Sequence, residues 1–186
     1  MSVQIARRHF NINEYYRMTD AGILSEGDRV ELIEGEVVEM SPIGSRHAAC
    51  VNRLNKLLNR LVASDVIVRV QNPIILDDYS EPQPDISLLR PHPDFYAQGH
   101  PTPADVLLVV EVADSSTQFD REIKLPLYAQ ARLQEVWLVN LSDETVELYS
   151  QPANGAYQIT QILKRGESLI SPASPNLNLD VNAILG

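Results

Sequence analysis

The sequence predicts a mixed α/β or α+β domain in which helices flank one central β-sheet. Three observations support this prediction. Segments with helical spacing alternate with short apolar runs, turn residues bound those runs, and apolar residues make up 44% of the 186-residue chain. The composition is ordinary for a folded protein. The length suits one domain with a substantial core, which we take to span residues 1–186.

Two segments in the N-terminal half have the spacing of amphipathic helices, Asn11–Leu24 and Arg46–Ala63. In the second segment, Leu54 and Leu58 fall on one apolar face, and Ser45 precedes it as a suitable N-cap. We expect that face to pack on the sheet.

Short apolar or alternating segments predict the strands. Arg29–Glu34 and Glu36–Met40 flank Gly35 and predict an N-terminal hairpin. Because Val106–Val110 has no polar residue, we expect a buried strand over Asp105–Ala113. The other expected extended segments are Val66–Val70, Pro73–Leu76, Asp85–Leu89, Glu135–Asn140 and a C-terminal antiparallel pair, Thr145–Ser150 with Tyr157–Leu163.

A third helix is expected between the two most apolar strands. It follows the cap residues Ser115–Thr117 and runs to about Arg132. Pro126 lies inside this segment and has no backbone N–H, so the helix must kink there or hold the proline in its first turn. The same helix carries Lys124, and its local geometry decides where that amine points.

The charge distribution limits the ways in which this chain could bind nucleic acid. A formal net charge of −10 argues against tight, non-specific binding by the whole surface. The stretch Met40–Ser64 nevertheless has no Asp or Glu and contains four cations: Arg46, Arg53, Lys56 and Arg60. This strip could contact a DNA backbone, although a solvated helix face explains it equally well.

The lengths of the apolar runs and the cysteine content indicate the cellular compartment of the protein. No apolar run approaches the roughly 18 residues of a membrane-spanning helix, so we expect no membrane contact. The one cysteine, Cys50, excludes an internal disulfide and a cysteine-rich zinc site. We therefore expect a cytoplasmic protein.

Two acidic residues are the strongest candidates for chemistry. Glu111 follows five apolar residues in a strand expected to be buried, where a carboxylate is costly unless it is paired or binds a metal. Asp85 begins a strand directly after Pro84, so its carboxylate can project from a rigid strand end. The alternatives are a glutamate at the solvent-facing end of its strand and a turn or cap aspartate.

Two carboxylates suit a particular metal chemistry. Mg²⁺ prefers oxygen ligands and is often held by one or two carboxylates together with water and phosphate oxygens. Such an ion can activate water and offset charge on a phosphodiester, and a nearby lysine can stabilise the same transition state. The pair therefore predicts a site for Mg²⁺ or Mn²⁺.

Pro84–Asp85, a loop and then Glu111–Ala113 resemble the PD-(D/E)XK nuclease signature. That signature has a lysine two residues after the second acid, where this chain has Ala113. In some members of the superfamily the following helix supplies the lysine, and Lys124 is the only lysine close downstream.

More closely, the chain resembles the Uma family, whose members are assigned as restriction endonucleases by fold and motif. The matching segments, in order, are Glu31–Gly35, Met40–Pro42, His47, Pro84–Asp85, Val109–Val112, Ser115, Asp120, Lys124 with Tyr128, and Glu135–Val139. The resemblance implies a restriction-endonuclease-like core in which Asp85 and Glu111 bind the metal and Lys124 is the migrated catalytic lysine. It also implies DNA as substrate and a homodimer, because two strands need two active sites.

Five further residues are weaker site candidates. Glu31 or Glu34 could reach the site from the hairpin, although an exposed hairpin carboxylate is an equal alternative. His47 could contact the substrate phosphate, and the alternative is a core or capping histidine. Gln71 could orient water. Asp120 precedes Lys124 by four residues and could orient its amine.

Three hypotheses about function follow. The first is a Mg²⁺-dependent DNA endonuclease built on Asp85, Glu111 and Lys124. The second is an inactive nuclease-fold module for binding or dimerisation, which the acidic pI and Ala113 favour. The third is a structural protein in which Glu111 only ends a strand. Metal binding that depends on both carboxylates distinguishes the first hypothesis from the third.

Overall fold

The computed structural model describes residues 7–25, 27–174 and 176–186. The helices are α1 (Ile12–Asp20), α2 (Ser45–Leu61), the 3₁₀ turn η1 (Pro103–Asp105), α3 (Thr117–Phe119), the π-helical turn η2 (Asp120–Lys124), α4 (Leu125–Gln130) and α5 (Val181–Leu185). The strands are β1 (Val30–Ile33), β2 (Glu36–Glu39), β3 (Ile67–Val70), β4 (Ile86–Leu89), β5 (Val106–Ala113), β6 (Glu135–Asn140), β7 (Thr145–Ala153), β8 (Ala156–Lys164), β9 (Ser168–Ile170) and β10 (Asn178–Asp180). Within these described ranges, no helix has both the length and the apolar character needed to cross a membrane.

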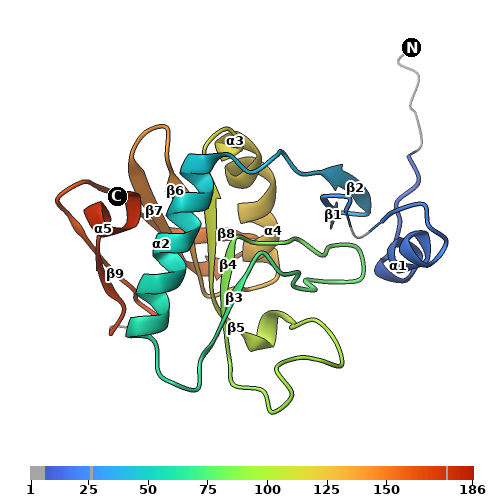
Figure 1. Ribbon diagram of the computed structural model, residues 1–186, viewed down its shortest axis with the longest axis horizontal. Helices are drawn as coiled ribbons and strands as arrows, with labels where there is room; N and C mark the ends of the chain where they lie inside the picture. Colours follow the sequence, from blue (N-terminus) through green and yellow to red (C-terminus); the bar gives the residue numbers. More distant parts are fainter. Residues whose placement is uncertain (1–6, 26, 175) are drawn as a thin grey trace.

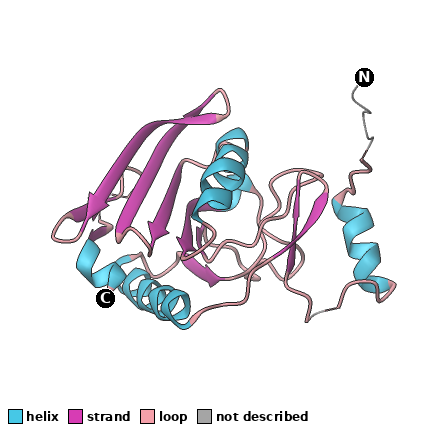
Figure 2. Cartoon of the chain, turned by 90° about the horizontal axis from the view of Figure 1, so that it is seen from above, coloured by secondary structure: helices cyan, strands magenta, loops and turns pink. Residues whose placement is uncertain are grey.

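A six-stranded mixed sheet forms the centre of the fold, in the order β3-β4-β5-β6-β7-β8 (Figures 1 and 2). β5 and β6 are parallel, because the chain crosses over through α3, η2 and α4 between them. Every other neighbouring pair in this sheet is antiparallel. The predicted fold class, a mixed sheet flanked by helices with an N-terminal hairpin and C-terminal antiparallel strands, is confirmed.

Helices cover both faces of the sheet, so the central strands are apolar on both sides. Leu54 and Leu58 of α2 belong to a core cluster on one face together with Trp137 of β6. Tyr128 of α4 belongs to the cluster on the other face, with Val109 of β5. This two-sided cover explains why the β5 sequence is almost uninterrupted in its apolar character, and it makes a carboxylate in that strand costly.

The predicted hairpin β1–β2 is confirmed and packs beside the sheet. Glu34 and Gly35 form its two-residue turn with φ values of 49° and 80°. A side chain at Gly35 would meet Cβ of His9 at 2.5 Å, so this position requires glycine. The N–H of Glu81 donates to the carbonyl of Leu32, which fixes β1 against the segment that leads into β4. Figure 1 shows the hairpin between α1 and the body of the sheet.

The differences from expectation are local. Gly44, not Ser45, is the N-cap of α2, and no side chain caps that helix. Pro73–Leu76 is not a strand, because its backbone N–H groups donate to loop carbonyls such as those of Pro82 and Pro101. The short strands β9 and β10 and the helix α5 were not predicted, because elements of three to five residues give too little periodicity.

The third helix contains a π-helical turn, where the sequence predicted a kink or a first-turn proline. The N–H of Leu125 donates to the carbonyl of Asp120, five residues earlier. In a regular α-helix the ring of Pro126 would clash with the carbonyl four residues before it, and the wider turn relieves this clash. Pro126 therefore lies in the first turn of α4. Within the π-turn, Asp120 and Lys124 are both buried, as is common for π-turns at functional sites.

Candidate active site

The two predicted acids lie side by side on neighbouring strands. Asp85 directly precedes β4, and Glu111 lies near the end of β5. The Asp85 N–H lies 3.4 Å from Glu111 Oε2, and the Val112 N–H donates to Asp85 Oδ2 at 2.9 Å. Only 9% of Asp85 and 4% of Glu111 are exposed. The antiparallel pairing of β4 and β5 therefore brings two carboxylates together at one buried point.

The amine of Lys124 lies beside this pair. Its Nζ is 3.3 Å from Glu111 Oε1 and 3.0 Å from Glu31 Oε2 on β1. Burial alone would lower the pKa of Lys124, but Glu111, Glu31 and Asp120 together raise it far above its usual value. The amine is therefore a permanent cation. The structure thus brings together three residues predicted from the sequence: Glu31, Glu111 and Lys124.

Burial dominates the behaviour of Glu111. It raises the pKa of this carboxyl to about 8, while the charge of Lys124 opposes the rise and the charges of Asp120 and Asp85 add to it. The hydroxyl of Tyr128 donates to Glu111 Oε1 at 2.5 Å. Because burial and Glu111 raise the pKa of Tyr128, the phenol keeps its proton and remains a donor. A carboxyl with a raised pKa is largely protonated near neutral pH, and a cation bound beside it would favour its charged form.

Two side chains that were weaker site candidates from the sequence, His47 and Gln71, contact Asp85. His47 Nε2 lies 3.0 Å from Asp85 Oδ2, and Gln71 Nε2 donates to Asp85 Oδ1 at 3.1 Å. The Asp85 contact raises the pKa of His47, while burial and the charge of Arg29 oppose the rise. Gln71 has a left-handed φ of 51°, a strained conformation for a non-glycine residue that is often retained at functional sites.

The remaining predicted residues divide into those at the site and those away from it. Asp120 lines the same cavity and accepts a hydrogen bond from Ser116 Oγ at 2.7 Å. Glu34 does not reach the site. It lies in the hairpin turn, where the left-handed backbone leaves the residue exposed, so its proposed role is corrected. Glu31 is the hairpin acid that faces the site.

The four cations of α2 lie outside the cavity that contains the two acids. Arg46 contacts Asp114 Oδ1 at 3.3 Å and the carbonyl of Leu141 at 2.9 Å. Arg53 donates to the carbonyl of Ile184 in α5. Lys56 and Arg60 are exposed. Arg46 and Arg53 therefore make hydrogen bonds within the protein. Contacts of these four cations with the phosphate backbone of DNA stay a prediction, and Lys56 and Arg60 are the more exposed candidates.

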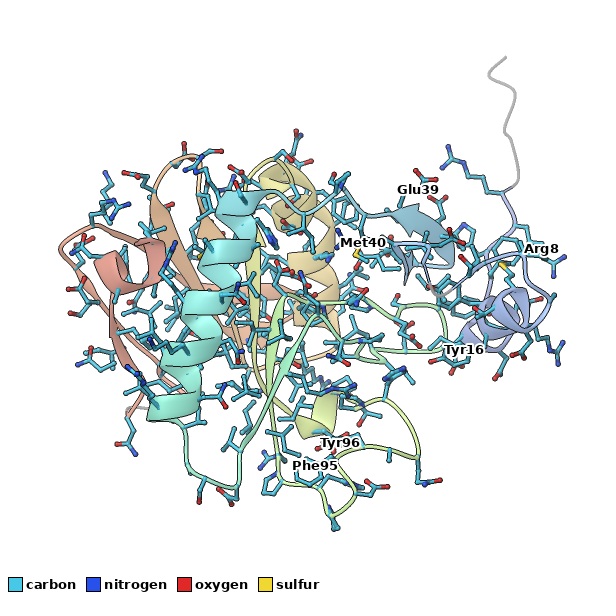
Figure 3. All side chains as sticks on the ribbon, in the orientation of Figure 1. Arg8, Tyr16, Glu39, Met40, Phe95 and Tyr96 are labelled. Atoms are coloured by element: carbon cyan, nitrogen blue, oxygen red, sulfur yellow. The ribbon has the colours of Figure 1, made fainter. Side chains whose placement is uncertain are left out.

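The site opens into a cavity of about 480 Å³ between the hairpin, α2 and the α3–η2 segment. Figure 3 labels Glu39 and Met40, two hairpin-side residues of its lining. Both Asp85 and Glu111 line it, as does the Lys124 side chain. The two acids therefore border an open cavity despite their low exposure.

The hydrogen-bond capacity of the two carboxylates fits a divalent ion. A carboxylate oxygen can accept about two hydrogen bonds. Asp85 Oδ2 and Glu111 Oε1 each already have two donors nearby, whereas Asp85 Oδ1 and Glu111 Oε2 have one each. One oxygen of each acid thus remains for a cation. In the described part of the chain, no group of three His, Cys, Asp or Glu side chains is arranged around a metal position. Two protein ligands suit Mg²⁺, which usually keeps several waters.

Of the residues that contact the two acids, Tyr128 is the one that the sequence indicated least clearly. It lies four residues after Lys124, but this spacing alone gives no sign that both side chains meet the same carboxylate oxygen.

We expect Tyr128→Phe to lower the free energy of unfolding by about 1.5–3 kcal/mol, because it removes a buried hydrogen bond to a charged group. Urea denaturation measures this change. Tyr79→Phe is the matched control, since Tyr79 is 49% exposed, and an equal loss in both variants would contradict the role of Tyr128.

Comparison with known proteins gives a consistent result. The model of the Uma2 family, described as "Putative restriction endonuclease", matches residues 12–182. A solved structure described as a "putative nuclease belonging to DUF820", from Anabaena variabilis ATCC 29413, has a TM-score of 0.72 and 17% sequence identity, covering 95% of this chain and 97% of that one. At this identity the structural likeness establishes the fold alone. No curated protein matches the chain. Because the family match extends over nearly the whole sequence, the chain belongs to the Uma2 family.

Proposed function

We propose that this protein is a nuclease that hydrolyses phosphodiester bonds in DNA with the help of Mg²⁺ or Mn²⁺. One observation carries the proposal. Asp85 and Glu111 meet at the floor of an accessible cavity, and the amine of Lys124 lies 3.3 Å from Glu111 Oε1. Two carboxylates that can hold a metal and a permanent cation that can stabilise developing charge are groups that metal-assisted phosphodiester hydrolysis uses. Membership of the Uma2 family supports the same reaction class.

Asp85 and Glu111 would hold the metal, each through the oxygen that retains hydrogen-bond capacity. A divalent ion held there would supply a more acidic bound water and a positive charge against the phosphate. The contacts around the acids serve to fix them before substrate binds. His47 and Gln71 orient Asp85, and Tyr128 orients Glu111. Such preorganisation avoids rearranging charged groups during the reaction.

Lys124 would stabilise the negative charge that develops on the phosphate. An ammonium group has three N–H donors, and two of them are directed to Glu31 and Glu111. The third remains for a phosphate oxygen or the attacking water in the cavity. Glu31 is then a positioning residue that holds the amine, and the N–H of Gln83 in turn holds Glu31 Oε2 at 3.1 Å.

A cleavage assay with Asp85→Asn tests this function. We expect the purified chain to cut single-stranded, duplex or branched DNA with Mg²⁺ or Mn²⁺ but not with EDTA. Asp85→Asn should lower the rate by about 10³-fold or more, because it weakens the metal site and breaks the pairing with His47. Asp65→Asn, an exposed turn residue, is the matched control and should retain activity. Inactivity of the wild type on all three DNA forms, or full activity of Asp85→Asn, would contradict the proposal.

A further inference from the structure

Three basic side chains line the cavity in the described part of the chain: Arg29, His47 and Lys124. Two of them are already paired with acids. Lys124 contacts Glu31 and Glu111, and His47 contacts Asp85. Arg29 takes part in none of the ion pairs among the described residues. Among the basic side chains of this lining, Arg29 is therefore the one whose charge no ion pair with an acid offsets.

The position of Arg29 is fixed by the end of the hairpin. Its carbonyl accepts a hydrogen bond from the N–H of Met40 at 2.8 Å, which extends the β1–β2 ladder by one pair. Its Nη1 donates to the carbonyl of Ser41 at 2.9 Å. A guanidinium has five N–H donors, so most of them remain available. The residue is exposed and lines the cavity, and its planar donor group matches a phosphate better than a lysine would.

Apolar side chains form part of the wall next to Arg29. Met40, Pro42 and Ile43 follow β2, and Phe119 faces the cavity from α3. Ile43 is 43% exposed, so its side chain is available for contact with a ligand. In Figure 3, Met40 lies between the hairpin and the body of the protein. An apolar wall beside a phosphate-binding cation suits a nucleotide whose base is not stacked in a duplex.

The depth of the site favours the same kind of substrate. Lys124, Glu111 and Asp85 are each at most 9% exposed, and all three line the cavity. A duplex is a stiff rod whose phosphates lie on its outer surface, and duplex binding depends on many surface cations. An unpaired strand bends freely, so one of its phosphates can enter a cavity of about 480 Å³.

We propose that this site takes an unpaired DNA strand, with one phosphate on the Arg29 guanidinium and the adjoining base against Met40, Ile43 and Phe119. This inference rests on the proposed nuclease function and assigns it a substrate class: single strands, flaps and frayed ends instead of intact duplex. In this proposal Arg29 binds the substrate, and Asp85 and Glu111 hold the metal. Substitution of Arg29 should therefore not change the metal site.

Fluorescence polarisation with labelled oligonucleotides tests the proposal. A single strand and the blunt duplex of the same sequence are each titrated with the full chain in the presence of Ca²⁺. Ca²⁺ takes the same oxygen ligands as Mg²⁺ in a looser geometry. A denaturing gel checks each sample for cleavage. We expect the single strand to bind about tenfold more tightly than the duplex. Arg29→Ala should weaken single-strand binding by about tenfold, since it removes a charge-assisted contact. Arg29→Lys should recover part of this loss.

Arg17→Ala is the matched control, because Arg17 is exposed on α1 and does not line the cavity. It removes the same charge and should change the affinity less than twofold. Equal or tighter binding of the duplex, or equal effects of the two alanine variants, would overturn the proposal. A preserved single-strand preference without cleavage by the wild type in Mg²⁺ or Mn²⁺ would instead overturn the proposed nuclease function and leave the binding site supported.

Discussion

Lys124→Ala is expected to abolish DNA cleavage while Mn²⁺ affinity is retained or increases. The variant removes the cation that would stabilise the phosphate, which should lower the rate by about 10³-fold. It also removes the amine that pairs with Glu31 and Glu111. Because both carboxylates then lack a cationic partner, the binding of Mn²⁺ beside them becomes more favourable. Single-turnover cleavage and calorimetric Mn²⁺ titration measure the two effects on the same preparation.

The two readouts separate catalysis from structure. Without metal, Lys124→Ala should lose about 3–5 kcal/mol of unfolding free energy, because it leaves buried carboxylates unpaired. Mn²⁺ should restore part of that stability. Lys164→Ala, at the exposed end of β8, should behave like the wild type. Cleavage that survives Lys124→Ala, or loss of Mn²⁺ binding together with cleavage, would contradict the assigned role.

Glu111→Gln is expected to remove the stabilisation that a divalent ion gives to the folded protein. For the wild type, Mn²⁺ at a hundred times its Kd should raise the free energy of unfolding by about 2.7 kcal/mol. The variant should show almost none of this increase, because an amide oxygen is a poorer and uncharged ligand. Without metal, the variant should unfold at a similar or higher temperature, since Lys124 still pairs with Glu31 and one buried charge is gone.

Glu122→Gln is the matched control for this experiment. Glu122 is exposed in the η2 turn, and Gln118 is its hydrogen-bond partner. Thermal scans with and without Mn²⁺ give the shift for each protein. An unchanged Mn²⁺-dependent shift in Glu111→Gln would show that this acid does not bind the ion.

Much of the fold and both acids could be predicted from local pattern. Glu111 was conspicuous because it interrupts an apolar strand, and Asp85 because it follows a proline at a strand start. Their proximity required the pairing of β4 with β5, which the order of the motifs made reasonable but did not establish. His47, a weaker candidate from the sequence, contacts Asp85.

The contacts of Lys124 and Arg29 could not be predicted in the same way. The direction of the Lys124 amine depends on a π-helical turn before Pro126, in which the angle between successive side chains differs from that of a regular α-helix. The choice between Glu31 and Glu34 depends on which residues form the hairpin turn. Arg29 begins a segment predicted as a hairpin strand, but nothing in the sequence indicates that its side chain lines the cavity of the two acids. These positions follow from tertiary packing and turn geometry.

An anomalous difference map from crystals soaked in Mn²⁺ tests most directly whether Asp85 and Glu111 hold a divalent ion. We predict one strong peak within about 2–2.5 Å of a carboxylate oxygen from each residue. Crystals of Asp85→Asn and Glu111→Gln, soaked in the same way, should lack the peak. Absence of the peak from the wild type, or a peak that both variants retain, would contradict a metal site built on these two acids.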